Sequence, residues 1–284
     1  MKTRANLMTM MNTVPDITMH LQRLQDVLAL HGKLAVAVSG GVDSMTLAAI
    51  ACRLNPATDV FHALSPAVPE LATQRVRDFA RQFNWRLHEI NAGEMADPAY
   101  QRNPANRCYY CKSNLYSSIS RHTNLQIAAG TNLDDLQDYR PGLLAAEEQQ
   151  VVHPLIEALI NKTTVRQLAT LMGLHELSEL PASPCLASRI TTGIAIDADL
   201  LPLIDQTEDA IRKLLGTTDS NTTIRCRIRN TGIAIQLDAG ISLQSAQLRA
   251  AVQQIFSDTP FAHYSERISI EPYQQGSAFI RVDA

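Results

Sequence analysis

The segment Ser39–Ser44, with the sequence SGGVDS, places small and polar residues between two apolar runs. A small-residue turn between a buried strand and a helix gathers unpaired backbone N–H groups at the positive end of the helix dipole. The glycines let a ligand approach the backbone, the serine hydroxyls add donors, and Asp43 could orient the turn or bind Mg²⁺. We therefore predict a phosphate-binding loop formed by Ser39, Gly40, Gly41, Asp43 and Ser44.

Three of the five cysteines also have a spacing that suits chemistry. Cys108 and Cys111 form a C-x-x-C pair, and Cys185 lies in a proline-flanked loop. An odd number of cysteines argues against a disulfide framework. The pair suits a metal or redox site, with an iron–sulfur cluster, zinc and a redox disulfide as alternatives. Cys185 could be a sulfur donor or a metal ligand, whereas Cys52 and Cys226 fall among apolar residues at helical and strand spacing, which predicts core positions.

Carboxylates follow the apolar run at 125–129. Gly130 places their loop at the end of a predicted strand, beside the phosphate loop in a parallel sheet. Arg140 could hold a carboxylate or phosphate with two hydrogen bonds. The acids could coordinate Mg²⁺, or they could form turns and face solvent; they are Asp134, Asp135 and Asp138.

Arginines define a further candidate site. Arg189 could hold a substrate anion, and a surface salt bridge is the alternative. Arg225, Arg227 and Arg229 lie on one face of a predicted strand, opposite Cys226. That face could bind the phosphate of a nucleotide, or it could be an ordinary solvated face.

Buried strands that alternate with helices must position these residues. Apolar runs predict strands at 34–38, 60–64, 87–90, 125–129 and around 151–152. Helical patterns occur at 42–54, 70–83, 109–121 and 162–172, the last with Asn161 as N-cap and Gly173 at its end. The alternation predicts an α/β fold with a parallel sheet covered on both faces.

A loop at 180–193 (LPASPCLASRITTG) interrupts this alternation and predicts a domain junction. Beyond it the patterns predict a helix at 197–215, strands at 223–229 and 232–238, a helix at 242–256, and strands near 267–270 and 279–282. This order suggests a roughly ferredoxin-like α+β domain. We predict two domains, an α/β domain at 15–180 and a smaller α+β domain at 181–284.

Composition limits the class of protein. A chain of 284 residues is long enough to bury one large core or two modest ones. No apolar run approaches the roughly 18–20 residues of a spanning helix, so we expect no membrane partner and a cytoplasmic location. A formal net charge of −3 argues against a dedicated nucleic-acid binder, which usually presents a basic face. A small-molecule partner is the better prediction.

The string SGGVDS resembles the PP-loop of ATP pyrophosphatases, which split ATP into AMP and pyrophosphate while adenylating a substrate. It is not a Walker motif, because the Gly-Lys-Ser/Thr ending is missing. Three further strings follow in order: NPANRCYYCKSNLY (103–116), GTNLDDLQDYRPG (130–142) and SPCLASRI (183–190). Together the four strings look like the LarE family of ATP-dependent sulfur transferases, over about residues 15 to 230.

This resemblance implies a PP-loop (HUP-like, adenine nucleotide alpha hydrolase-like) domain, with ATP across the C-terminal ends of a five-stranded parallel sheet. It also implies Mg²⁺ and a homo-oligomer. Family members adenylate a carboxylate of a pyridinium dicarboxylate mononucleotide and replace its oxygen with sulfur, in the synthesis of the nickel-pincer nucleotide cofactor. Members with a lone cysteine at the position of Cys185 give up its sulfur. The pattern of Cys108, Cys111 and Cys185 resembles the members that carry a [4Fe–4S] cluster on three cysteines.

The resemblance fades towards the C-terminus. The family usually follows its R-x-R string with a histidine and an acidic A-R-I-E string, whereas this chain has Arg229 and AIQL at 234–237. ITTG follows Arg189 where an aromatic residue is usual, and Glu208 matches a family acidic position. These departures fall where the sulfur acceptor would bind.

We predict an ATP-dependent sulfur transferase with Cys185, Asp43 and Arg189 as catalytic residues. Lys112 directly follows Cys111, and its ammonium would favour a thiolate or an anionic cluster. Arg140, Arg225 and Arg227 are the predicted substrate and phosphate ligands. A tRNA-thiolating PP-loop enzyme and a non-catalytic nucleotide-binding regulator are the alternatives.

Overall fold

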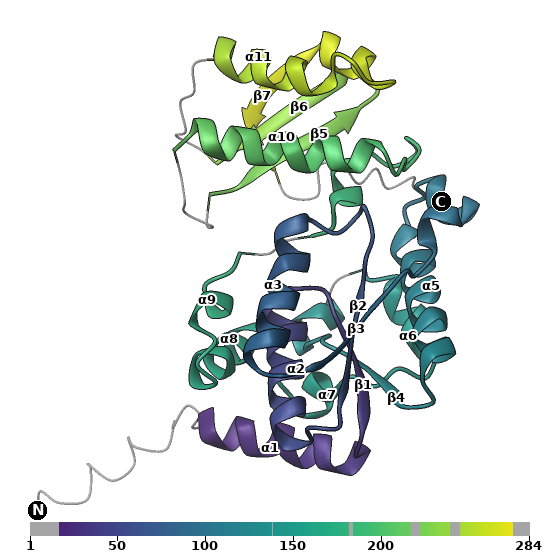
Figure 1. Cartoon of the computed structure of the whole chain (residues 1–284), viewed down its shortest axis with the longest axis vertical. Helices are drawn as coiled ribbons and strands as arrows, with labels where there is room; N and C mark the ends of the chain where they lie inside the picture. The colour runs from purple at the N-terminus through teal and green to yellow at the C-terminus, as the bar shows by residue number, and fades with distance from the viewer. Residues whose placement is uncertain (1–16, 138, 182–183, 217–221, 239–244, 275–284) are drawn as a thin grey trace, which may run out of the picture.

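The computed structural model describes residues 17–137, 139–181, 184–216, 222–238 and 245–274 (Figure 1). Its N-terminal part is built on a parallel sheet with strand order β3-β2-β1-β4. The strands are β1 (Leu34–Val38), β2 (Asp59–Ala63), β3 (Arg86–Ile90) and β4 (Gln126–Ala129). The predicted α/β architecture is therefore confirmed, and the four strands begin within one residue of their predicted starts.

The fifth expected strand, around 151–152, is a single bridge. Val152 forms an isolated parallel pair with Ala128. Its N–H donates to the carbonyl of Ile127 at 2.9 Å, and its own carbonyl accepts from Ala129 N at 3.0 Å. Helices α6 (Gly142–Glu148) and α7 (Pro154–Glu157) lie close before and after it, which leaves too little extended chain for a longer strand.

Helices cover both faces of this sheet because successive side chains of β1 point to opposite sides. Leu34, Val36 and Val38 belong to the apolar cluster on one face. Ala35 and Ala37 belong to the cluster on the other. The first face packs against α1 (Ile17–His31), α2 (Val42–Leu54), α3 (Glu70–Gln82), α7 and α8 (Lys162–Leu171). The second packs against α5 (Arg107–His122) and α6 (Figure 1).

The C-terminal part contains a second sheet with strand order β5-β6-β7. Strand β5 (Ile224–Arg229) is antiparallel to β6 (Gly232–Leu237), and β7 (Ile268–Pro272) is parallel to β6. Helices α10 (Leu200–Leu214) and α11 (Ser245–Phe256) share its apolar core. The predicted element order holds as far as residue 274; the strand expected near 279–282 lies outside the described residues.

Packing is continuous across the predicted domain junction. Ala67 and Tyr100 belong to the same apolar cluster as the core of the C-terminal part. Short helical segments join the larger elements: η1 (Glu94–Ala96), α4 (Pro98–Gln101), η2 (Leu133–Gln137), α9 (His175–Ser178), η3 (Leu186–Arg189) and η4 (Ala262–Glu266). A boundary at residue 180 stays a prediction. None of the helices in the described ranges is long and apolar enough to cross a membrane.

Asn103 ties the start of α5 to the segment that follows η3. It is fully buried, and its amide nitrogen donates to the carbonyls of Thr191 and Ile194, both at 2.9 Å. Its amide oxygen accepts from Arg107 Nη1 at 2.9 Å, and its carbonyl accepts from Gly193 N at 3.0 Å. Through this residue, the helix that carries the C-x-x-C pair is bonded to the segment after Cys185.

Candidate functional site

The phosphate loop has a conformation that requires glycine at its centre. Gly40 has a φ of +77°, and a Cβ there would lie 2.6 Å from the carbonyl oxygen of Ala72. The Ser39 N–H donates to Ser44 Oγ at 3.1 Å, and that hydroxyl donates to the carbonyl of Gly41 at 3.2 Å. Gly41 is the N-cap of α2 and has no side chain to cover the first N–H groups of the helix. The loop thus presents these groups at the C-terminal end of β1, where an anion is favoured.

The loop after β4 lies directly on the start of α2, as the position of Gly130 predicted. A Cβ at Gly130 would lie 2.7 Å from both the nitrogen and the Cα of Ser44. Real Cβ atoms do not approach backbone this closely, so only glycine fits. The two loops are therefore neighbours at one edge of the sheet.

Asp43 lies at the centre of a polar contact that links three segments of the chain. Its carboxylate forms an ion pair with the ammonium of Lys162 at the start of α8. Asn132 Nδ2 donates to Asp43 Oδ1 at 3.1 Å. The backbone N–H of Lys162 donates to Asp134 Oδ2 at 3.0 Å, which fixes the start of α8 beside the loop after β4.

Lys162 and Asn132 are functional candidates that the sequence reasoning missed. Lys162 lies 119 residues from Asp43, and only the fold brings them together. The ion pair is partly exposed, with 33% of the lysine side chain and 22% of the aspartate side chain accessible. A cation in this position suits an ATP-binding loop, because a polyphosphate can compete for it.

Arg75 on α3 is a second cation at the phosphate loop, and it was also missed. Its Nη1 donates to the carbonyl of Gly40 at 2.8 Å. Burial lowers the pKa of Arg75, whereas the charge of Glu176 raises it. A guanidinium still carries its charge at neutral pH. Lys162 and Arg75 therefore both place positive charge beside the loop.

The acids of the loop after β4 form turns and ion pairs. Asp135 Oδ2 accepts from Asn132 N at 3.0 Å, and Asp135 Oδ1 pairs with Arg140 Nη2 at 2.6 Å. Asp134 caps Lys162 as described above. Asp138 lies outside the described residues. The carboxylate of Asp135 thus closes a turn within the loop, whereas that of Asp134 bonds the start of α8. A Mg²⁺ site on Asp135 and Asp138 stays a prediction.

The three candidate cysteines are free thiols on two segments. Cys108 and Cys111 lie in the first turns of α5, and the exposed Cys185 directly precedes η3. Cys111 packs against the apolar cluster that contains Leu186. Burial raises the pKa of Cys111 to about 12; Lys112 lowers it, and Cys185 raises it. Burial and the charge of Cys185 likewise raise the pKa of Cys108.

Thiolates are suitable metal ligands, but the arrangement of these three cysteines does not by itself form a metal site. Three thiols that influence one another electrostatically are a suitable donor set for an iron–sulfur cluster. In the part of the chain that the structure describes, however, no three His, Cys, Asp or Glu side chains are placed so that they could hold a metal ion. The cluster stays a prediction, and we derive no step through it.

Arg189 is buried and fully engaged. Its Nε and Nη2 donate to the two carboxylate oxygens of Glu208 at 2.9 and 3.0 Å. Its Nη1 donates to the carbonyls of Pro184 at 2.5 Å and Cys185 at 3.2 Å, and to Ser188 Oγ at 3.1 Å. The alternative of a surface salt bridge is wrong, since only 2% of the arginine side chain is exposed. In this structure Arg189 fixes the cysteine loop to α10, and substrate binding by it stays a prediction.

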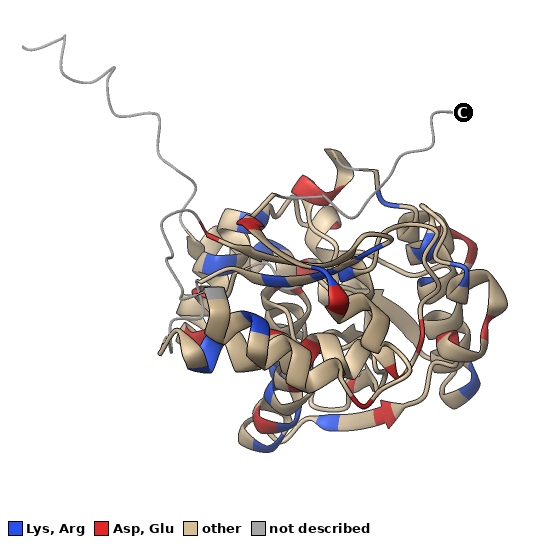
Figure 2. Ribbon diagram, turned by 90° about the horizontal axis from the view of Figure 1, so that it is seen from above, with Lys and Arg blue, Asp and Glu red and all other residues tan. Residues whose placement is uncertain are grey.

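The arginines of β5 differ from one another in burial. Arg227 is 4% exposed, which rules out a solvated position for it; its Nε donates to Gln236 Oε1 and its Nη1 to the carbonyl of Ser188. Burial, together with the charges of Arg189 and Arg225, lowers the pKa of Arg227 to about 10. Arg229 pairs with Glu271 at 2.5 Å. Figure 2 shows basic positions along the strands of this sheet. Clustered guanidinium groups favour an anion beside them.

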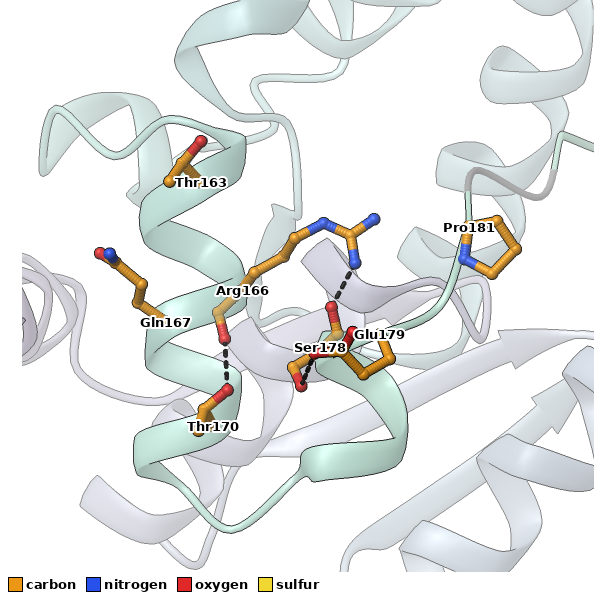
Figure 3. A pocket seen from close by; sticks show the side chains of 7 residues that line it. All are labelled: Thr163, Arg166, Gln167, Thr170, Ser178, Glu179 and Pro181. Carbon is orange, nitrogen blue, oxygen red and sulfur yellow. Dashed lines mark hydrogen bonds between the residues drawn. The ribbon is translucent and has the colours of Figure 1, made fainter. Parts of the chain in front are cut away.

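A polar hollow between α8 and α9 contains none of the predicted site residues. Arg166 lies in its wall and donates to the carbonyls of Ser178 and, at 2.6 Å, of Leu180 (Figure 3). Arg166 therefore holds the end of α9 and the start of the segment that leads to Cys185. Since the guanidinium already bonds two carbonyls, we assign no ligand to this hollow.

Comparison with known proteins identifies relatives of this chain by sequence similarity. No protein-family model matches it. An uncharacterized protein of Synechocystis sp., slr1717, is 32% identical over 266 residues, which cover 90% of this chain and 95% of the relative. The chain belongs to the family of slr1717. An uncharacterized protein of Methanocaldococcus jannaschii, MJ0830, is 26% identical over 184 residues, or 63% of this chain and 69% of the relative.

A third relative has a described activity. The pyridinium-3,5-bisthiocarboxylic acid mononucleotide synthase of Lactiplantibacillus plantarum is 27% identical over 213 residues, which cover 72% of this chain and 74% of the synthase. This synthase is a LarE enzyme, so the predicted relation to LarE is confirmed at the level of a distant homologue. The parallel sheet agrees with a PP-loop-like fold.

Proposed function

We propose that the protein is an ATP-dependent sulfur transferase that adenylates a substrate carboxylate and then exchanges a carboxylate oxygen for sulfur. The observation that carries this proposal is the contact of Asp43 with Lys162 at a glycine loop, in a homologue of a LarE synthase. A phosphate loop with an adjacent exchangeable lysine supports ATP binding. The cysteines on neighbouring segments support the use of sulfur.

In the first step, a carboxylate oxygen of the substrate attacks the α-phosphorus of ATP. The bond breaks between the α-phosphorus and the oxygen that links it to the β-phosphorus, and pyrophosphate leaves with the electron pair. The open N–H groups of α2 and the cations of Lys162 and Arg75 would stabilise the charge on the leaving group. Mg²⁺, when bound, would neutralise part of the same charge.

In the second step, a sulfur nucleophile attacks the activated acyl carbon. A carbon–sulfur bond forms, the acyl–oxygen bond breaks, and AMP leaves with the electron pair. Cys185 is the exposed thiol of the three and is the candidate nucleophile. If its own sulfur is given up, the bond from Cβ to sulfur breaks as the Cα proton is lost, and dehydroalanine remains.

The proposed acceptor is a pyridinium dicarboxylate mononucleotide or a closely similar carboxylated nucleotide. The name of the L. plantarum relative supports this class of substrate. Arg225 and Arg227 would receive the nucleotide phosphate, because the positive charges of Arg189 and Arg225 lower the pKa of Arg227 and an anion beside these groups would offset that repulsion. Arg140 would take a carboxylate, in exchange for Asp135. We also propose a homo-oligomer, in line with the family resemblance.

We further propose that Cys108, Cys111 and Cys185 hold a [4Fe–4S] cluster under anaerobic conditions. Such a cluster, when bound, would supply one iron without a protein ligand, which could take up hydrosulfide. Anaerobic reconstitution followed by iron analysis and absorption spectroscopy tests the assignment. Iron binding that is unchanged in Cys108→Ala would contradict it, and loss of one sulfur at Cys185 after turnover would favour the sacrificial route.

The activity itself is tested by incubation with Mg-ATP and candidate carboxylated nucleotides. We expect pyrophosphate and AMP in equal amounts, with a product whose mass shows one oxygen replaced by sulfur. Asp43→Asn is the matched control, since it keeps the size of the side chain and removes the charge that faces Lys162. Release of ADP and phosphate by the wild-type protein would contradict the proposal.

A further inference from the structure

The hydroxyl of Tyr100 is a buried polar group that the proposed function does not use. Tyr100 lies on α4 and is 1% exposed. Its hydroxyl has no hydrogen-bond partner among the residues that the structure describes. An unpaired buried hydroxyl costs about 1–3 kcal/mol, so its presence calls for an explanation.

The packing around Tyr100 places it at the cysteine site. It belongs to the apolar cluster that includes Leu186 and Ala187 of η3, and Cys111 packs against the same cluster. The backbone around α4 is bonded to the segment after η3, since Ile196 N donates to the carbonyl of Gln101 at 2.8 Å. Tyr100 therefore lies where the helix that carries Cys111 meets the segment that carries Cys185.

The charged and titratable groups around the hydroxyl keep it protonated. Burial raises the pKa of Tyr100, and Cys185, Cys111 and Glu94 raise it further, whereas Arg107 lowers it. A neutral phenol can donate one hydrogen bond. The hydroxyl is thus a permanent donor in a site that contains thiols.

We propose that Tyr100 donates a hydrogen bond to the sulfur anion that is held at the Cys111–Cys185 site. This anion is either the thiolate of Cys185 or a hydrosulfide ion bound beside the two cysteines. The inference rests on the proposed function, because it concerns the sulfur that the second step consumes. A hydrogen bond from this buried hydroxyl to the sulfur anion would hold the sulfur in place.

Tyr100→Phe removes the hydroxyl and keeps the ring, so it isolates this hydrogen bond. Tyr116→Phe is the matched control. Tyr116 lies on α5 and is 2% exposed, but it packs in the apolar cluster between the parallel sheet and helices α5 and α6. The full chain is kept anaerobic and titrated with sodium sulfide, and the near-ultraviolet tyrosine absorption is followed. We expect sulfide to change the tyrosine absorption of the wild type and of Tyr116→Phe, but not that of Tyr100→Phe.

Cys185→Ser separates the two sources of the anion. If hydrosulfide is the acceptor, the change caused by sulfide persists in this variant. If the Cys185 thiolate is the acceptor, Cys185→Ser shifts the tyrosine absorption before sulfide is added, and the same substitution causes no shift in a Tyr100→Phe background. If neither the addition of sulfide nor Cys185→Ser changes the absorption of Tyr100, the proposal is overturned.

Single-turnover measurements separate this inference from the proposed function. We expect sulfur transfer to slow by about 10- to 100-fold in Tyr100→Phe, as for the loss of a hydrogen bond to a charged group, while pyrophosphate release stays unchanged. Unchanged sulfur transfer, or a lowered unfolding midpoint together with slower pyrophosphate release, overturns the role of Tyr100. A wild-type protein that releases no pyrophosphate contradicts the proposed function and leaves the sulfide titration to decide on Tyr100.

Discussion

Two charged regions of the molecule are built in opposite ways. At the phosphate loop, the ion pair of Asp43 and Lys162 is partly exposed and lies between segments at the edge of a sheet. Near the cysteine loop, Arg189 and Glu208 are 2% and 8% exposed, and Arg189 also holds loop carbonyls. The first arrangement leaves charges that a ligand can recruit, whereas the second uses its charges to hold the chain together.

The exposure of an ion pair therefore distinguishes charges that can bind a ligand from charges that stabilise the fold, whereas the residue types alone do not. A buried ion pair that loses one partner leaves the other charge desolvated, which is strongly destabilising. A partly exposed pair contributes little to stability because water solvates each partner alone. Substitutions in the two regions should therefore change different observables.

The largest expected effect is on stability, at Glu208. Glu208→Gln should lower the free energy of unfolding by about 3–5 kcal/mol, since it leaves the buried guanidinium of Arg189 uncompensated. Chemical denaturation measures the loss. Glu271→Gln is the control, because the Arg229–Glu271 pair is 30% exposed on both sides, and it should cost about 1 kcal/mol or less. Equal losses of unfolding free energy in the two variants would contradict the distinction between buried and partly exposed ion pairs.

The next effect is on ATP binding, at Lys162. Lys162→Met should weaken ATP binding by about 10- to 100-fold through loss of a charge-assisted hydrogen bond to phosphate. The free energy of unfolding should change by about 1 kcal/mol or less. Calorimetric titration and denaturation measure the two quantities. Lys33→Met is the control, since Lys33 is 38% exposed and pairs with Asp59, outside the phosphate loop. Unchanged ATP affinity in Lys162→Met would contradict the role of Lys162.

A smaller effect at Gly41 tests whether the loop backbone meets the ligand. A Cβ at Gly41 would meet only Ser39 Oγ at 3.5 Å, an ordinary contact, and the φ of −85° suits any residue. Gly41→Ala should therefore change stability by about 1 kcal/mol or less but weaken ATP binding by about 10-fold. Gly40→Ala, by contrast, should also destabilise the fold, because its Cβ would clash with Ala72. If both variants bind ATP normally, phosphate does not contact this turn.

The smallest expected effect is a pH dependence of folding stability that arises at His62, next to the phosphate loop. His62 bonds the carbonyl of Val38 through Nδ1 and the hydroxyl of Thr73 through Nε2, both at 3.0 Å, and burial lowers its pKa below 6.5. The unfolded chain then takes up the proton first, so stability falls as the pH drops below 6.5. Denaturation between about pH 7 and about pH 5 should show a shallower slope in His62→Gln. Part of the slope should remain, since the pKa of His153 is also lowered; an identical slope would contradict the assignment to His62.

The sequence predicted the elements well because their signal is local. The apolar runs and the turn residues fixed α2 at Val42–Leu54 and β1 at Leu34–Val38 without error. The same alternation along β5 placed Cys226 in the core, where it is fully buried. It could not show that Arg227 is buried as well and that its guanidinium bonds the carbonyl of Ser188 in η3.

The site was predicted only in part, because its charges are paired across long separations. The SGGVDS string pointed to the phosphate loop. It contains no information about Lys162, which joins Asp43 from another helix. The burial of Arg189 depends on Glu208 and on the packing of α10, and the hydroxyl of Tyr100 became notable only when its surroundings were known.

The separation of Asp43 from Lys162 also has a consequence for the chain during its synthesis. The two residues are 119 positions apart, whereas Arg189 and Glu208 are 19 apart. A ribosome that adds about 5–20 residues per second needs on the order of ten seconds to pass from the glycine loop to the lysine. Throughout that interval the nascent chain has the loop without its lysine. A product truncated before residue 162 therefore cannot form the Asp43–Lys162 contact, which waits until the lysine itself has been added to the chain.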